Sequence, residues 1–262
     1  LEQQVNDELY DVIAQAAIPS EKDIQAEYNR LLEEQRKLYD EDTNQFFNDY
    51  DAGEVLLVYV PYDYVKMQHI LISYPSEQLE EIQSLYMDIY ELEADLAEEE
   101  DAEKRSELEE KQAELDTLMQ EGASLIQEET DDLYQQALEA DRDEFIQMVI
   151  NYTDDTGQNT KQACELGYLV GEGDFIDEDI RQAALSLADG QIAEPILTVN
   201  GYHIVRRDSV LEAGEISLEE VREKLTEQLT SQRQTDAWED SAEQWIEAAE
   251  IERFDDIYKL DT

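Results

Sequence analysis

The amino-acid sequence predicts an α+β fold, in which long helices are joined to a smaller, turn-rich unit that contains the β-strands. Glycine separates the two parts, because none occurs between Gly53 and Gly122 whereas six lie between Gly157 and Gly201. Glycine is unfavourable inside helices and favourable in turns, so its absence indicates long helices. The chain has 262 residues, 41% of them apolar, which suffices for one large domain or two modest ones with a buried core.

The N-terminal part predicts two helices and then a strand. Apolar residues at helical spacing indicate a helix over 1–18, and Pro19 ends it because proline lacks the backbone donor. Ser20 and Asp23 have the side chains of a new helix start. Residues 54–60 are β-rich and end at Pro61, so we expect a strand there.

Residues 76–126 predict an antiparallel helical hairpin with a polar tip at 97–101. Apolar residues recur at steps of three and four along both halves, as a coiled-coil seam requires. We favour an arm that projects from the body; a helix pair docked along its whole length is the alternative. The seam residues are Ile82, Leu85, Ile89, Leu92 and Leu96, followed on the return by Leu108, Leu115, Leu118 and Leu125.

The pattern changes after residue 130. Residues 196–199 and 202–206 predict a β-hairpin that turns at Asn200-Gly201, a strong two-residue turn signal. The other elements expected in this part are short helices over 133–138 and 145–149, a strand over 166–170, a helix over 177–187 and a helix over 217–250.

The net charge of -51, from 69 acidic and 18 basic residues, argues against nucleic-acid binding, which requires lysines and arginines that neutralise phosphates. Docking on an anionic bilayer is disfavoured for the same reason. The charge suits weak capture of basic or unfolded partners, and a solvated surface without partner preference is the alternative. Cys164 is the only cysteine, so no intramolecular disulfide forms, and no apolar run approaches the length of a membrane span.

Both histidines of the chain lie in short apolar strands. His69 lies within 65–73 and His203 within 198–205. A strand histidine is most often a core residue, so position alone does not indicate chemistry. No cysteine or carboxylate accompanies them at the spacing of a metal cage, and we expect no metal site.

The segments around the second histidine carry several motifs in a characteristic order. They read Glu-Leu-Gly-Tyr at 165–168, Ala-Leu-Ser-Leu-Ala-Asp-Gly-Gln-Ile-Ala-Glu-Pro-Ile at 184–196, and Asn-Gly-Tyr-His-Ile-Val at 200–205. In this order they resemble parvulin-type peptidyl-prolyl isomerases, over 64–75 and 130–208. The resemblance implies a parvulin-like domain at 64–208, with an antiparallel sheet of about four strands, surrounding helices and 76–126 as an inserted hairpin.

The resemblance also implies the catalytic residues. The family's first strand histidine corresponds to His69 and its last to His203. Its cysteine or aspartate corresponds to Asp155, and its threonine on the penultimate strand corresponds to Thr198. Asn200 replaces the serine of the turn, and we expect it to contact substrate.

The prolyl pocket of the family would be formed here by Leu166, Ile176 and Ile180, where the family usually has leucine, methionine and phenylalanine. The two isoleucines remove the ring face on which a proline stacks, so we expect weak isomerase activity. Rotation about an X–Pro bond makes and breaks no covalent bond, so the reaction needs neither nucleophile nor cofactor. The pocket would hold the proline, and the polar residues would stabilise the twisted amide.

The two ends of the chain lie on either side of this unit, as in bacterial extracytoplasmic foldases of the PrsA/SurA type. The resemblance implies a helical chaperone domain built from 1–63 and 209–262. It also implies a foldase for exported proteins with X–Pro bonds at the bacterial cell envelope. We expect a lipid anchor upstream of Leu1, at the outer face of the cytoplasmic membrane, and a homodimer is possible. The alternative is a weak or inactive parvulin-fold scaffold that only binds extended clients.

Overall fold

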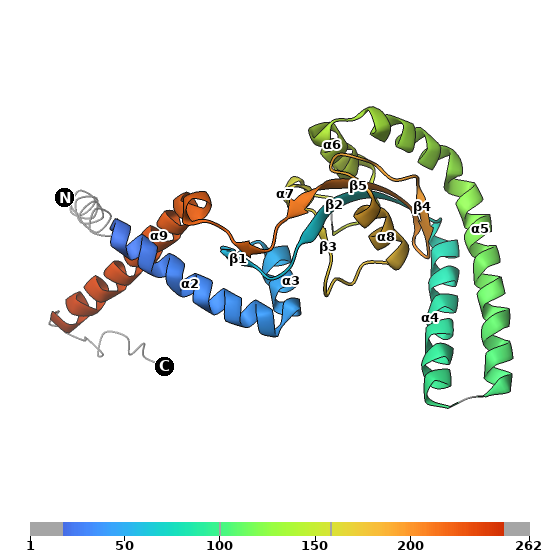
Figure 1. The fold of residues 1–262 in the computed structure, drawn as a ribbon, viewed down its shortest axis with the longest axis horizontal. Coiled ribbons are helices and arrows are strands. Elements are labelled where there is room, and N and C mark those ends of the chain that lie inside the picture. Colours follow the sequence, from blue (N-terminus) through green and yellow to red (C-terminus); the bar gives the residue numbers. More distant parts are fainter. Residues whose placement is uncertain (1–17, 100, 158, 249–262) are drawn as a thin grey trace, which may run out of the picture. The chain divides into compact units, whose positions relative to one another are not determined.

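The computed structural model describes residues 18–99, 101–157 and 159–248 (Figure 1). They form two compact units. The first, here called the sheet unit, comprises residues 38–55 and 60–214. The second, the helical unit, comprises the described parts of 1–37, 56–59 and 215–262. The helix expected over 1–18 lies outside the described residues except for Ile18.

The sheet unit is built on a four-stranded antiparallel sheet with the order β3-β2-β5-β4. Its strands are β2 (Tyr64–Ser73), β3 (Tyr168–Val170), β4 (Ile196–Thr198) and β5 (Gly201–Leu211). On the central strands, His69 is opposite Val205 and His203 is opposite Leu71. Opposite residues share a face and side chains alternate with period two, so both histidines lie on one face. The predicted α+β class is confirmed.

The sheet unit contains helices α3 (Thr43–Ala52), α4 (Ser76–Glu98), α5 (Ala102–Glu139), α6 (Arg142–Tyr152), α7 (Lys161–Leu166) and α8 (Glu178–Ser186). Helices cover both faces of the sheet (Figure 1). Ile180 of α8 shares a buried cluster with Met67 and Val205, on the histidine face. Phe145 of α6 shares another with Ile70, on the opposite face. The sheet is therefore buried on both sides, which holds the histidine strands rigidly.

The helical hairpin is present as α4 and α5, which project together beyond the sheet (Figure 1). Ile82, Leu85, Ile89 and Leu115 of the predicted seam are buried. Leu125 is 67% exposed, so its assignment to the seam was wrong. The residues of α5 that are buried around this position are Gly122, Ala123 and Ile126, which lie on another side of the helix.

α5 does not stop near residue 126 but continues as one helix to Glu139, so the separate helix expected over 133–138 is wrong. Nothing in this stretch breaks a helix, and the buried Thr130 hydroxyl bonds back to the Ile126 carbonyl. At the crossing with the sheet, a β-carbon on Gly122 would lie 2.5 Å from the Tyr74 ring. Glycine thus permits the close approach that docks the base of the arm.

The segment 38–55 packs with the sheet, whereas we expected it to belong to the terminal helices. The cause is an aromatic cluster: Phe46 of α3 stacks on Tyr64 of β2 at 5.1 Å between ring centroids, and meets Tyr39 edge to face at 5.4 Å. All three side chains are almost completely buried. Such packing outweighs the continuity of residues 38–41 with the preceding helix α2 (Glu21–Glu41), of which they are the last turn.

The helical unit consists mainly of α9 (Leu218–Ala248) and of helix α2 (Glu21–Glu41). The last residues of α2, from 38 onward, belong to the sheet unit. Its core contains Tyr28, Val58 and Leu225. None of the described helices combines the length and the apolar character needed to cross a bilayer.

The strand expected over 54–60 is much shorter in the structure. Only β1 (Tyr59–Val60) pairs, with β6 (Gly214–Glu215). The Gln35 side chain instead accepts from the Val58 N–H at 2.8 Å and donates to the Leu56 carbonyl at 2.8 Å. A buried side-chain amide thus satisfies backbone groups that a strand partner would otherwise serve.

The β4–β5 turn also differs from the expectation. Thr198 pairs with Gly201, so the two turn residues are Val199 and Asn200 rather than Asn200 and Gly201. Gly201 opens β5 with φ of 135°, and a β-carbon there would lie 2.1 Å from the Ile72 carbonyl oxygen. The glycine is required by close contact with the neighbouring strand, a cause that is not local to the turn.

Candidate active site

The two histidines meet on the face of the sheet covered by α8. Their Nδ1 atoms lie 2.9 Å apart, and the rings stack with centroids 5.0 Å apart at an interplanar angle of 27°. Both side chains are buried. The juxtaposition follows from the strand register, in which His203 is opposite Leu71, two residues from His69. Residues 134 positions apart in the sequence thus form a hydrogen-bonded pair.

Asp155 reaches this pair from the loop after α6. Beyond the end of β3, the loop bonds to the free edge of β2: the Leu71 N–H donates to the Thr153 hydroxyl, and the Asp154 N–H donates to the Leu71 carbonyl. Asp155 Oδ2 then lies 2.8 Å from His69 Nε2 and 2.7 Å from the Tyr168 hydroxyl. The loop therefore holds the Asp155 carboxylate in hydrogen-bond contact with the His69 ring.

Thr198 closes the network at the other end. Its hydroxyl lies 3.0 Å from His203 Nε2 and accepts the Asn200 N–H at 3.1 Å. The four residues predicted as catalytic, His69, Asp155, Thr198 and His203, are thus brought into one continuous chain of hydrogen bonds. Their catalytic roles remain a proposal.

When both histidine rings are neutral, each hydrogen bond of this network has a defined donor and acceptor. An ionised Asp155 only accepts, so His69 Nε2 donates to it and His69 Nδ1 accepts. His203 Nδ1 must then donate to His69, which leaves His203 Nε2 to accept from the Thr198 hydroxyl. One carboxylate at the end therefore determines the tautomer of both imidazoles.

The surroundings of Asp155 and of His203 support the protonation states assigned to these two residues. Hydrogen bonds from His69, Tyr168 and the Gly157 N–H hold the pKa of Asp155 well below its usual range, against the opposing effect of burial. Burial, with a smaller contribution from the neighbouring His69, lowers the pKa of His203 to about 3. At neutral pH the network thus has an anionic Asp155 and a neutral His203.

Acid should destabilise the sheet unit through His203. Its pKa is about 3 in the fold against an ordinary 6.5, so between these values the unfolded chain binds a proton that the folded chain excludes. The contribution to stability is complete above the ordinary pKa and falls by up to about 1.4 kcal/mol per pH unit below it. Asp155 adds a loss in the same direction only below its ordinary 3.8.

His203→Gln should lack this dependence. The difference in unfolding free energy between wild type and variant, measured by urea titration, should shrink by about 1–2 kcal/mol from about pH 7 to about pH 5. A difference that stays constant with pH would show that His203 does not titrate as described.

A small cavity of about 170 Å³ opens beside the histidines. Of the predicted substrate-binding residues, Ile176, Ile180 and Asn200 line it. Leu166 does not: it ends α7, where its carbonyl accepts a hydrogen bond from Tyr50. The full lining is Met67, His69, Tyr168, Ile176, Asp177, Ile180, Thr198, Asn200 and His203.

Met67 and Tyr168 are lining residues that sequence reasoning missed. Met67 precedes His69 by two positions on the same strand, so period-two alternation could have placed it on the histidine face. Tyr168 meets the His69 ring edge to face at 5.3 Å between centroids. A thioether and an aromatic ring are therefore present beside the cavity, although Ile176 and Ile180 supply neither.

A family model for the PPIC-type PPIase domain matches residues 80–223. The chain belongs to this family. The match confirms the family and the peptidyl-prolyl isomerase domain inferred from the sequence motifs. It begins after His69, so the assignment of the first histidine rests on the motif around it and on the geometry above.

Curated relatives include the foldase protein PrsA of Clostridium botulinum strain Langeland, 27% identical over 118 residues, which cover 44% of this chain and 34% of the relative. PrsA of Clostridium perfringens strain 13 is 24% identical over 131 residues, covering 49% and 38%. The aligned part thus spans little more than a third of these relatives.

Two solved structures align with most of the chain. A structure from a study of PEB4 and Cj1289, two SurA-like chaperones of Campylobacter jejuni, aligns at 15% identity and a TM-score of 0.35, covering 96% of this chain and 71% of that one. PrsA of Bacillus subtilis aligns at 14% identity and a TM-score of 0.28, covering 96% and 84%.

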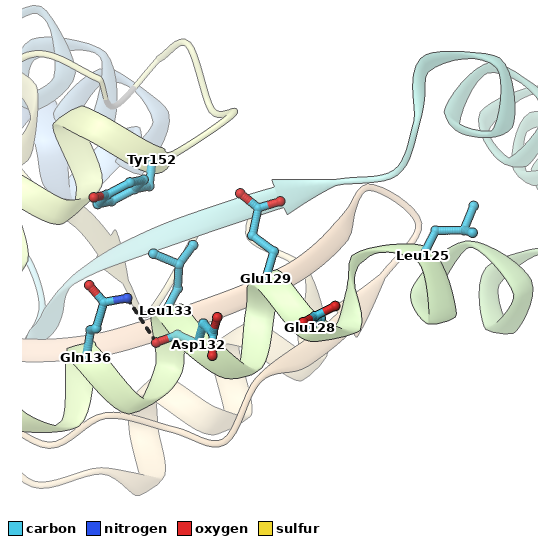
Figure 2. A pocket seen from close by; sticks show the side chains of 7 residues that line it. All are labelled: Leu125, Glu128, Glu129, Asp132, Leu133, Gln136 and Tyr152. Atoms are coloured by element: carbon cyan, nitrogen blue, oxygen red, sulfur yellow. Dashed lines mark hydrogen bonds between the residues drawn. The ribbon is translucent and has the colours of Figure 1, made fainter.

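A second hollow lies on α5 and α6, and its lining differs from that of the cavity beside the histidines (Figure 2). Its volume is about 430 Å³. Figure 2 shows acidic side chains along α5 with Tyr152 across from them, and no histidine among the labelled residues. The lining is Leu125, Glu128, Glu129, Asp132, Leu133, Gln136 and Tyr152. We call this second hollow the acidic hollow. Its lining residues do not form a hydrogen-bonded network like the one from Thr198 to Asp155.

Proposed function

We propose that this chain is a peptidyl-prolyl cis–trans isomerase that assists the folding of exported proteins. The observation that carries the proposal is the ordered chain from Thr198 through both histidines to Asp155, lying beside an apolar cavity of about 170 Å³. Family membership and relatives named foldase support the same activity. A scaffold that only binds clients is the less favoured function.

The proposed mechanism uses binding and electrostatics alone. The barrier of roughly 18–20 kcal/mol arises because the amide loses conjugation when it twists. Met67, Ile176 and Ile180 would hold the prolyl ring, so that rotation occurs in the preceding amide bond. The hydrogen-bonded network beside the prolyl ring is already oriented by Asp155. It can therefore stabilise the twisted amide without reorganising.

The proposed clients are unfolded or partly folded exported chains with X–Pro bonds. We place the protein outside the cytoplasm, at the bacterial cell envelope, with a lipid anchor upstream of Leu1 and a homodimer as further proposals. The helical unit, in this proposal, holds clients during isomerisation. Fractionation of cells and sedimentation of the purified chain test the location and the dimer.

Filling the cavity should abolish activity without unfolding the protein. Ile176 is half-buried and lines the cavity from the loop between β3 and α8, so Ile176→Trp places a large ring where the proline would bind. A protease-coupled assay on a tetrapeptide with one X–Pro bond should show catalysis by wild type and at least a tenfold loss in the variant, about 1.4 kcal/mol of transition-state binding.

The matched control is the adjacent Phe175, which is 87% exposed and does not line this cavity. Phe175→Trp should retain wild-type turnover, with circular dichroism confirming that both variants are folded. Wild-type turnover no faster than the uncatalysed reaction, with peptide binding retained, would reject the isomerase and leave the scaffold.

A further inference from the structure

One exposed face of the inserted hairpin runs directly from the rim of the proposed prolyl cavity. Asn200 lines the cavity, and its side-chain oxygen accepts a hydrogen bond from Gln83 of α4 at 3.1 Å. In a helix, residues four and seven positions further lie on the same face. Met87 and Tyr90 therefore continue from Gln83 along the side of α4 that touches the cavity rim.

This face, here called the α4 stripe (Gln83, Met87 and Tyr90), is not needed to hold the hairpin together. Met87 is 53% exposed and Tyr90 is 61% exposed. The α4–α5 contact instead uses Ile82, Leu85 and Ile89, which are buried on another side of the helix.

The composition of the stripe suits varied peptide side chains. Methionine is flexible and polarizable and adapts to different apolar partners, while tyrosine offers a large contact area at low entropic cost. Single exposed apolar residues are ordinary on protein surfaces. Met87 and Tyr90, however, lie on adjacent turns and continue from a cavity that is proposed to bind a client segment. We therefore expect the same client segment to contact them.

Charge specifies that occupant further. α4 carries acidic residues and neither lysine nor arginine. Glu80 and Glu91 are exposed close to the stripe, and the whole chain has a net charge of -51. A segment with basic residues is therefore attracted to this helix, whereas an acidic segment is repelled.

We propose that the α4 stripe extends the prolyl cavity and binds the client segment that neighbours the proline, with preference for a segment that combines basic with aromatic or aliphatic residues. The inference rests on the proposed function, whose substrate class it narrows. Tyr90 lies about 10 Å along the helix from Gln83, a distance that about three extended client residues span.

The test uses three labelled peptides. A tetrapeptide with one X–Pro bond fills only the cavity. Two longer peptides add Lys-Phe-Leu-Lys, one about three residues before the proline and the other about three residues after it. Wild type should bind one of the long peptides, by fluorescence anisotropy, about 5–10-fold more tightly than the tetrapeptide. The better of the two gives the direction in which clients lie. Replacing Lys-Phe-Leu-Lys by Glu-Ser-Ser-Glu should remove the gain.

The decisive variant is Met87→Ser with Tyr90→Ser, which should reduce the long-peptide gain to less than about twofold and leave tetrapeptide turnover unchanged. The matched control is Leu125→Ser with Tyr152→Ser, which removes similarly exposed side chains beside the carboxylates of the acidic hollow. This control should keep the full gain.

Equal loss in both double variants, or no loss in the first, would overturn the proposal. A changed molecular mass of the first variant in sedimentation, with peptide affinity intact, would assign the stripe to contact between copies and would overturn it as well. Absence of tetrapeptide turnover in wild type rejects the isomerase instead, and anisotropy still reports on the stripe.

Discussion

Asp155→Ala should lower isomerase kcat/KM about 10–100-fold, because hydrogen bonds to a charged group contribute roughly 1.5–3 kcal/mol and this carboxylate orients the whole polar chain. Without it, the His69 Nε2–H loses its acceptor and either nitrogen of that ring can carry the proton. The ring of His203 then no longer has a single favoured tautomer. Nitrogen chemical shifts of the two histidines, measured by NMR, should change from one tautomer to a mixture.

The same substitution should destabilise the fold by roughly 2–4 kcal/mol, since it leaves the His69 ring and the Tyr168 hydroxyl as half-buried or buried donors without this acceptor. Asp154→Ala is the matched control, because Asp154 is the adjacent acid and its side chain accepts the Ser73 N–H at an exposed position, outside the histidine network. It should change activity less than twofold. Wild-type activity in Asp155→Ala would reject the role assigned to the carboxylate.

Gly201→Ala should destabilise the sheet unit by at least about 3 kcal/mol, the largest effect expected of an alanine at any of the glycines that the structure describes. The added β-carbon would lie 2.1 Å from the Ile72 carbonyl oxygen, which belongs to the adjacent backbone and cannot move aside easily. The residue also has φ of 135°, where side chains cost roughly 1–3 kcal/mol by themselves. Calorimetry should show a loss of roughly 6–12 °C in the melting temperature of this unit.

Gly214→Ala separates the two causes. Gly214 has a similar φ of 121°, but a β-carbon there would meet nothing within 4 Å. This control should show only the backbone cost, roughly 1–3 kcal/mol. Equal destabilisation by both substitutions would mean that contact with Ile72 contributes little, and that the strand shifts to accommodate the methyl group.

Much of the candidate active site could be predicted from local pattern and motif. The apolar strands around His69 and His203 are recognisable from composition, and the order of the motifs that follow indicates the family. The long helices follow from the absence of glycine and from apolar spacing. These features depend on residues near one another in the sequence, which is why the chain alone reveals them.

The sequence by itself therefore determined the family and the fold class, and it singled out His69, Asp155, Thr198 and His203, which the structure brings into one hydrogen-bonded network. Only the tertiary structure decided that Met67 and Tyr168 rather than Leu166 complete the cavity, that Gln35 replaces a strand partner for residues 56–58, and that Gln83 links the hairpin to the cavity rim. The physical reason is that packing partners are chosen by shape and unsatisfied backbone groups across long sequence separations. No local periodicity records which distant side chain will fill a given space.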